Sequence, residues 1–276
     1  MASNKIKNDK YYTSPKLAKY CVDKTKEIIG KDNITEWLEP SGGNGVFLDY
    51  LPDGTYSCDI EPEDDRIVKQ DYLELKMDYK KGRCVIGNPP FGVRNRLSYR
   101  FFKKSIRLCD YIAFILPISQ LNNNIQYYDF DMIYSEDLGK QNYSDREVHC
   151  CLNIYKMPLK NILNNKPNFK LLDVMIKESM RNNHNLNARR QIVEYKDFKY
   201  DIRICAFGSS IGKEVKYEEQ YVNEFSIKIN NIKYRDNILK ILKNVQWKNI
   251  YSMTKTPNLT QWQVYKYLKE QIPELE

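Results

Sequence analysis

The sequence predicts an α/β domain with a largely parallel β-sheet, followed by a smaller α+β region. Three observations support this prediction. Short apolar runs alternate with helical patterns through residue 156. Most of these runs stop at a proline, a glycine or an acidic residue, which is typical of strands that end at the edge of a sheet. Past residue 160 this alternation is replaced by polar segments, short strands and two amphipathic helices.

The first part of the chain begins with a helix. Ser14 can cap it and Pro15 suits its first position, and the apolar spacing that follows predicts that it ends at Gly30. Further helices are expected at residues 45–51, after a glycine-rich turn, and at residues 96–110. Strands are expected at residues 33–40, 54–62, 66–71, 83–90, 111–117 and 147–157.

The second part has a different composition. Residues 161–170 and 181–190 are polar and predict loops. Short strands are expected at residues 200–210 and 224–230, and amphipathic helices at residues 235–245 and 260–272. We therefore expect two domains, residues 1–160 and residues 161–276.

Charge is unevenly distributed between these two parts. The net charge is +8, and residues 161–276 carry 20 Lys/Arg against 13 Asp/Glu, whereas residues 1–160 carry 24 against 23. A basic second half indicates a polyanionic partner, although solvated surfaces are also often basic. The lysine-rich N-terminus has no apolar signal region, and no apolar run reaches membrane-spanning length, so we expect a cytoplasmic protein without membrane association.

The cysteines and histidines argue against a metal centre. There are seven cysteines without C-x-x-C spacing and only two histidines. This pattern predicts reduced, buried thiols and no metal site.

A glycine-rich turn follows the first strand. Gly42, Gly43 and Gly45 let the backbone turn tightly and approach a ligand closely. The turn fits neither a phosphate loop nor G-x-G-x-x-G. The preceding acid, Glu39, suits a cationic or hydrogen-donating ligand better than a pyrophosphate, although a plain strand-to-helix turn is the alternative.

Acids also close the next two strands. Asp59 could accept both hydroxyls of a ribose. Asp71 could accept from an adenine amino group, and the ring of Tyr72 could lie against the base. Each is weak evidence alone, since solvated acids are common, but their order predicts a nucleoside bound at the sheet edge.

These residues carry a family resemblance that covers roughly residues 11–156. The segments are, in order, "YTSP", "EPSGGNG", "CDIE", "QDYL", "GNPPFG" and "FILP". Their order resembles that of S-adenosylmethionine-dependent amino-group methyltransferases, of the gamma class of DNA adenine-N6 enzymes. The resemblance implies a Rossmann-like methyltransferase fold, with a mostly parallel seven-stranded sheet and helices on both faces, and S-adenosylmethionine as cofactor.

The resemblance also implies a role for individual residues. Thr13 would lie near the methionine part of the cofactor, and Glu39 and Ser41 would line its methionine and sulfonium region. Ser41-Gly42-Gly43 departs from the commoner sequence of this turn, and the later family motifs, which would supply a second wall of the target pocket, find no clear match. The implied cofactor residues are Thr13, Glu39, Ser41, Gly43, Asp59, Ile60, Asp71, Tyr72 and Asn88.

The Asn-Pro-Pro-Phe segment, Asn88 to Phe91, is the implied catalytic element. The Asn88 side-chain oxygen and the Pro89 carbonyl would accept the hydrogens of a flat amine and favour a pyramidal, nucleophilic nitrogen. Phe91 would stack on the target base. Pro90 together with Pro89 would stiffen the corner, so the geometry is set before the substrate arrives.

Basic residues near this corner indicate contacts with DNA. Arg94, Arg96 and Arg100 follow it, and Arg189 and Arg190 end a polar loop that we expect to contact bases. A solvated helix face and a plain surface loop are the alternatives. The expected partners are duplex DNA, from which the target base would be flipped out, and a cognate restriction endonuclease.

Other substrates stay open at this point. RNA adenine-N6 methylation and DNA cytosine-N4 methylation use the same kind of corner, and so does methylation of a protein glutamine. A non-catalytic module that kept the fold is a further alternative, which the intact Asp71, Asn88 and Phe91 disfavour.

Overall fold

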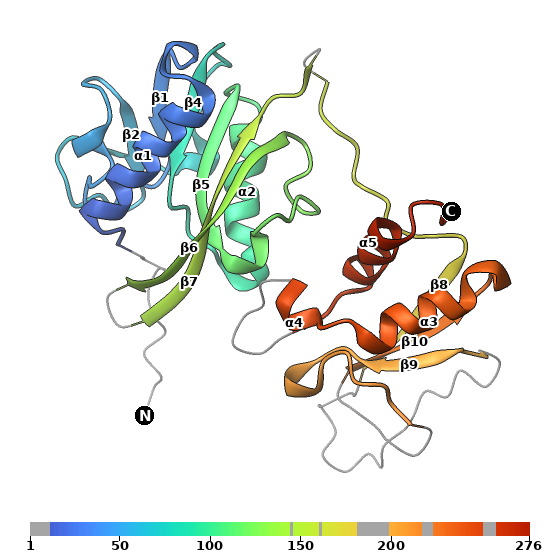
Figure 1. Cartoon of the computed structure of the whole chain (residues 1–276). Helices are drawn as coiled ribbons and strands as arrows, with labels where there is room; N and C mark the ends of the chain where they lie inside the picture. The colour runs from blue at the N-terminus through green and yellow to red at the C-terminus, as the bar shows by residue number, and fades with distance from the viewer. Residues whose placement is uncertain (1–11, 144–145, 160–161, 181–198, 217–222, 251–257) are drawn as a thin grey trace. The chain divides into compact units, whose positions relative to one another are not determined.

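The computed structural model describes residues 12–143, 146–159, 162–180, 199–216, 223–250 and 258–276 (Figure 1). The chain divides into two compact units, Met1–Pro167 and Asn168–Glu276. The first unit extends beyond the expected boundary at residue 160 because Asn164 is held to it: its backbone N–H donates to the Asp129 carbonyl (3.0 Å) and its side chain donates to Asp131 (2.8 Å).

The first unit contains one seven-stranded sheet. Its strands are β1 (Glu36–Glu39), β2 (Tyr56–Asp59), β3 (Val68–Lys69), β4 (Arg83–Gly87), β5 (Tyr111–Pro117), β6 (Asp131–Tyr143) and β7 (Arg146–Lys156). Their order is β3-β2-β1-β4-β5-β7-β6; the first five are parallel and β7 is antiparallel to both of its neighbours. This topology confirms the expected Rossmann-like methyltransferase fold.

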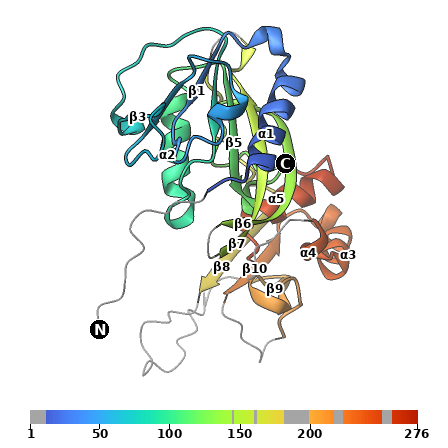
Figure 2. The same ribbon diagram turned by 90° about the vertical axis from the view of Figure 1, so that its left-hand side faces the viewer.

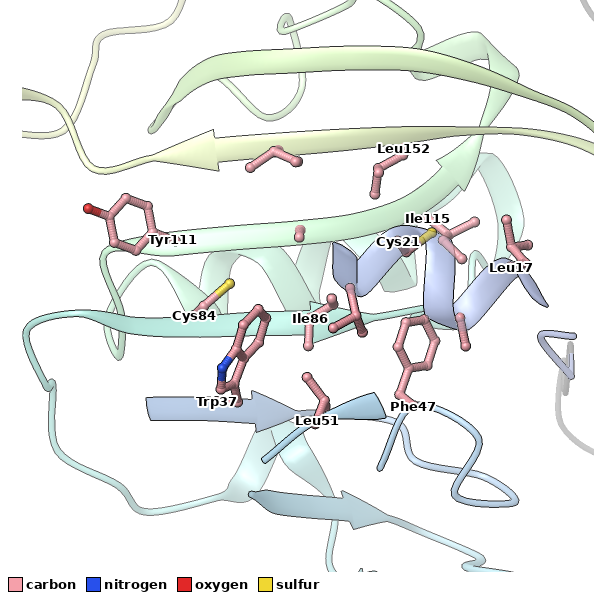
Figure 3. Close-up of a cluster of buried hydrophobic side chains, with 14 of the residues drawn as sticks. Leu17, Cys21, Trp37, Phe47, Leu51, Cys84, Ile86, Tyr111, Ile115 and Leu152 are labelled. Atoms are coloured by element: carbon pink, nitrogen blue, oxygen red, sulfur yellow. The ribbon is translucent and has the colours of Figure 1, made fainter. Parts of the chain in front are cut away.

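The two α-helices of this unit cover opposite faces of the sheet (Figure 2). α1 (Pro15–Ile29) begins as predicted, with the Ser14 hydroxyl accepting from the Leu17 N–H. It packs on the side chains that point to one face of the sheet, among them Trp37 and Ile86 (Figure 3). α2 (Arg96–Ser105) packs on the alternate side chains, which point to the other face. Burial on both faces explains why the central strands are continuous apolar runs.

Some local predictions were wrong. The helix expected at residues 45–51 is a single 3-10 turn, η2 (Leu48–Tyr50), because Pro52 and Gly54 turn the chain back toward β2 before a helix can form. The third expected strand is short, and the helix expected to reach residue 110 ends at Ser105.

β6 was not expected at all. Its sequence is polar. Among the described strands it pairs with β7 alone, in a long hairpin that is interrupted twice by a register shift. Such an edge strand needs no apolar face, so it leaves little trace in hydrophobic periodicity.

The second unit is an α+β structure, as predicted. Its three strands, β8 (Val174–Met180), β9 (Ile202–Cys205) and β10 (Asn223–Ile229), form an antiparallel sheet in the order β8-β10-β9. Its helices are α3 (Arg235–Asn244), α4 (Trp247–Ile250) and α5 (Gln261–Gln271), which share an apolar core with one face of this sheet. The sequence predicted β9, β10, α3 and α5 but missed β8 and α4.

The cysteines behave as expected for a reduced protein: all seven are buried as free thiols. In the part of the chain that the structure describes, no helix combines the length and the apolar character needed to cross a membrane. The same residues bring no three potential metal ligands together.

Candidate active site

A pocket opens where β1 and β4 end. The two strands are parallel and adjacent, so Glu39 and the Asn88 corner reach the same edge of the sheet. The pocket unites five of the predicted cofactor residues with five others. Its lining consists of Tyr12, Thr13, Glu39, Ser41, Gly42, Gly43, Asn44, Val46, Phe47 and Asn88.

Gly43 shapes the turn that forms one side of the pocket. Its φ is +55°, and a Cβ there would meet no atom within 4 Å, so the backbone faces open space. Its N–H donates to Oδ2 of Asp59 at 3.0 Å. The turn is thereby tied to the end of β2 while its surface stays accessible to a ligand.

Glu39 is the one charged side chain in the described lining of the pocket. Its side chain is fully buried, and Oε2 accepts from the hydroxyl of Ser57 at 2.8 Å. Its second oxygen, Oε1, has no hydrogen-bond partner among the described residues. Burial raises the pKa of Glu39 to about 7, and the Ser57 hydrogen bond opposes this shift. A cationic ligand would satisfy Oε1 and restore the carboxylate charge.

Asp59, Ile60 and Asp71 lie at the ends of the neighbouring strands, beyond the pocket lining. Asp59 accepts two backbone N–H groups, from Gly43 and from Glu61 (2.9 Å), which leaves acceptor capacity on both oxygens. The Ile60 side chain is 50% exposed, and Asp71 is exposed with Oδ1 accepting from the Leu73 N–H at 2.8 Å. These residues are accessible for the nucleoside contacts that the sequence predicted.

The prediction for the ring of Tyr72 was wrong. The side chain is 1% exposed, its hydroxyl is 2.7 Å from the Ser105 hydroxyl, and its ring packs at 5.2 Å from that of Phe101. The aromatic ring therefore belongs to the core beneath α2 and cannot lie against a bound base.

The Asn88 corner is held by hydrogen bonds on two sides. Asn88 Nδ2 donates to Thr13 Oγ1 at 3.2 Å, and the Asn88 backbone carbonyl accepts from Ser41 Oγ at 3.3 Å. Pro89 is buried and Pro90 is half-buried. The Phe91 carbonyl accepts from the Leu97 N–H at 3.2 Å, which ties the corner to the start of α2. The corner is therefore fixed in position before any ligand binds.

The ring of Phe91 does not offer an open stacking surface. It is 6% exposed and packs in the core cluster that α1 covers. The expectation that Phe91 stacks on a target base is not met, because the ring is buried in that cluster.

The basic residues after the corner differ in availability. Arg96 and Arg100 are exposed and lie on one face of α2, four residues apart. Lys103 and Lys104, further along the helix, contact Asp129 and the Leu75 carbonyl. Arg94 lies in the 3-10 turn Val93–Asn95, and nothing is described of its side chain. Arg189 and Arg190 lie outside the described residues.

Sequence reasoning missed several residues of the pocket. Tyr12 lines it, and its hydroxyl donates to Glu63 Oε1 at 2.5 Å. Phe47, 2% exposed, forms an apolar wall. Both flank a recognised motif, Tyr12 beside Thr13 and Phe47 just after the glycines, and this adjacency was the available signal.

Comparison with known proteins returns similar folds only. Neither a protein-family model nor a curated protein sequence matches the chain. A proposed RNA methyltransferase from Pyrococcus horikoshii has 14% identity and a TM-score of 0.43, covering 53% of this chain and 86% of that one. A proposed class I S-adenosylmethionine-dependent methyltransferase from Listeria monocytogenes has 13% identity and a TM-score of 0.40, covering 53% of this chain.

A third solved structure is the methyltransferase subunit of a type I restriction-modification system from Streptococcus thermophilus. It has 13% identity and a TM-score of 0.39, with 53% of this chain covered. This chain spans 60% of the Listeria protein and 44% of the Streptococcus subunit. Identities and TM-scores this low assign no activity or substrate to the chain.

Proposed function

We propose that this protein transfers a methyl group from S-adenosylmethionine to an exocyclic amino group of a nucleic-acid base, specifically N6 of adenine in duplex DNA. One observation carries the proposal. Glu39, the glycine turn and the Asn88 corner line a single pocket at the carboxyl ends of β1 and β4. In open α/β sheets, ligands bind at this edge.

The residues of this edge fit the parts of S-adenosylmethionine. Glu39 would hold the ammonium of its methionine part, because Oε1 is buried and lacks a partner among the described residues. Asp59 would accept the ribose hydroxyls with its remaining lone pairs. Asp71 would accept the adenine amino group, and the half-exposed Ile60 would contact the base.

The Asn88 corner would act on the acceptor amine. When bound, the cofactor supplies an electrophilic methyl carbon. The Asn88 side-chain oxygen and the Pro89 carbonyl would each accept one amine hydrogen, which favours a pyramidal nitrogen with its lone pair directed at that carbon. The same two oxygens would stabilise the positive charge that develops on the nitrogen. As the N–C bond forms, the C–S bond would break and S-adenosylhomocysteine would leave, and the extra proton on the nitrogen would then pass to solvent. No protein nucleophile and no strong base is needed before attack.

Basic surfaces support the proposed duplex DNA substrate. A base inside a duplex cannot reach the corner, so it would be flipped out. Arg96 and Arg100 are exposed beside the corner and would contact the flanking phosphates. The second unit, within the basic residues 161–276, would supply further contacts, including those of Arg189 and Arg190. We place the enzyme in the cytoplasm of a bacterium, or of the host of a phage or virus, and propose a cognate restriction endonuclease as its partner.

The test is a methyl-transfer assay with the full chain. Labelled S-adenosylmethionine is incubated with duplex DNA, single-stranded DNA, RNA or a protein extract, and labelled nucleic acid is hydrolysed to nucleosides. We expect label in duplex DNA as N6-methyladenine. Label in N4-methylcytosine, RNA or protein would overturn the assigned acceptor and keep the methyl transfer. Absence of label in every acceptor, from protein that is folded, would overturn the proposed function.

A further inference from the structure

Thr13 and Asn88 contact each other although they are 75 residues apart in the sequence. Thr13 precedes the cap of α1, and its side chain is 5% exposed. Its Oγ1 accepts a hydrogen bond of 3.2 Å from Nδ2 of Asn88. The buried hydroxyl is therefore directed at the side-chain amide of the Asn88 corner.

A side-chain amide is chemically different at its two ends. The oxygen only accepts hydrogen bonds, and the NH2 group only donates them. An acceptor amine offers hydrogens, so the Asn88 amide must present its oxygen toward it. If the amide were rotated by half a turn, NH2 would face NH2, and the amine would lose an acceptor.

We propose that Thr13 is a positioning residue that holds the Asn88 amide in the orientation that presents Oδ1 to the amine. This inference rests on the proposed function. In the observed arrangement the Thr13 hydroxyl accepts from Nδ2, and Oδ1, at the other end of the amide, is a buried atom. Ser41 fixes the backbone of Asn88 separately, through its carbonyl. The backbone and the side chain of Asn88 are thus held by different residues.

This role differs from the cofactor contact that the family resemblance implies for Thr13. A cofactor contact affects the affinity for S-adenosylmethionine. A positioning role affects the rate of transfer at saturating cofactor, because the amide orientation matters only for the acceptor. The two roles are therefore separable by measurement.

Three variants of the full chain test the inference. Thr13→Val keeps the shape and removes the hydroxyl, and Thr13→Ser restores a hydroxyl. Thr25→Val is the matched control. Thr25 is a buried residue of α1, and its hydroxyl donates to the Cys21 carbonyl at 2.6 Å. For each, kcat is measured at saturating S-adenosylmethionine, the Kd of the cofactor by calorimetry, and Tm by circular dichroism.

We expect Thr13→Val to lower kcat roughly five- to tenfold with little change in the cofactor Kd. Thr13→Ser should regain most of the loss, and Thr25→Val should keep its kcat. A Thr13→Val protein with weakened cofactor binding and an unchanged kcat would overturn the inference. So would a Thr13→Ser protein as slow as Thr13→Val, or an equal loss of kcat in Thr25→Val.

A second readout does not depend on activity. The side-chain NH2 resonances of Asn88, assigned by their absence from Asn88→Ala, should shift in Thr13→Val and return in Thr13→Ser. Unchanged resonances in Thr13→Val would overturn the inference. Failure of the proposed function is distinguishable, since it would appear as a wild-type protein that transfers no methyl group to any acceptor.

Discussion

Each unit contains a buried glutamate, and their surroundings differ. Glu224 of the second unit has a side chain 7% exposed, and it accepts from Arg203 Nη2 at 2.7 Å. Glu39 of the first unit is fully buried, accepts from one serine hydroxyl, and has an oxygen without a partner in the described part of the chain. The charge of Glu224 is neutralised by Arg203 within the fold, whereas Glu39 has only a serine hydroxyl as its described partner.

The difference distinguishes a carboxylate with a structural role from one that we propose binds a ligand. A buried carboxylate that lacks a cationic partner costs stability and raises its own pKa, as Glu39 does. A ligand that supplies the missing charge removes this cost when it binds. For this reason, perturbed titratable groups in pockets are typical of functional sites. A buried ion pair such as Arg203–Glu224 carries no such indication. Four predictions test this contrast.

The largest effect on catalysis is expected at the Asn88 corner. Asn88→Ala removes one of two oxygens that stabilise the developing charge, so kcat should fall by about 10²–10³-fold. The cofactor Kd should change little, because Glu39 and Asp59 are intact. Transfer kinetics and calorimetry measure the two effects. Asn244→Ala is the control, since the Asn244 amide donates to the Lys240 carbonyl of its own helix. A variant that fails to fold would instead indicate that Asn88 has a purely structural role in the turn.

The largest effect on stability is expected in the second unit. Arg203→Ala leaves the charge of Glu224 buried, so the free energy of unfolding should fall by about 3–5 kcal/mol. Affinity for S-adenosylmethionine should not change, because the pair lies outside the pocket. Urea denaturation followed by circular dichroism measures the loss. A variant of wild-type stability would contradict the structural role of the pair.

Glu39→Gln should raise rather than lower the free energy of unfolding, and the gain should grow as the pH rises from about 4.5 to about 7. The pKa of Glu39 is raised from 4.5 to about 7, so its protonated form is favoured in the folded state. Its contribution to stability is full below pH 4.5 and is lost as pH rises through about 7. In the ligand-free protein, Glu39→Gln should therefore match the wild type near pH 4 and exceed it in free energy of unfolding by about 3 kcal/mol at pH 8.

Thermal denaturation at the two pH values measures this effect. Affinity for S-adenosylmethionine should fall in Glu39→Gln at pH 8, since a neutral amide cannot balance the ammonium. A variant that is less stable than the wild type at pH 8 would mean that the carboxylate is satisfied within the fold, as Glu224 is.

The smallest effect is expected from the exposed arginines of α2. Arg96→Ala and Arg100→Ala should each weaken DNA binding severalfold and reduce the salt dependence by about one phosphate contact. Lys19→Ala, which removes an exposed cation paired with Asp23 on α1, is the control. Binding titrations at several salt concentrations measure the slope. Slopes equal to that of the wild type would exclude α2 from the DNA interface.

Much of the first unit could be predicted from the sequence, for an identifiable physical reason. Its central strands are buried on both faces and read as apolar runs, and they end at residues such as Pro40 and Pro117 that resist strand continuation. The residues just beyond those ends share one edge of the sheet. The grouping of Glu39, Gly43 and Asn88 in one pocket follows from this geometry.

The remaining features depend on tertiary packing that no local pattern encodes. The ring of Tyr72 turns into the core because Ser105 and Phe101, on a helix 30 residues later in the chain, accommodate it. The edge strand β6 is polar and lacks the periodicity of a buried strand. The bond between Thr13 and Asn88 joins the start of α1 to the end of β4, and sequence spacing says nothing about it.

The most direct test of the central claim is a crystal structure of the full chain with S-adenosylmethionine bound. The account predicts the adenosine beside Asp59 and Asp71, the ammonium at Glu39 Oε1, and the sulfonium methyl directed toward Asn88. A cofactor bound at another place, or bound here with its methyl group directed away from Asn88, would contradict the account.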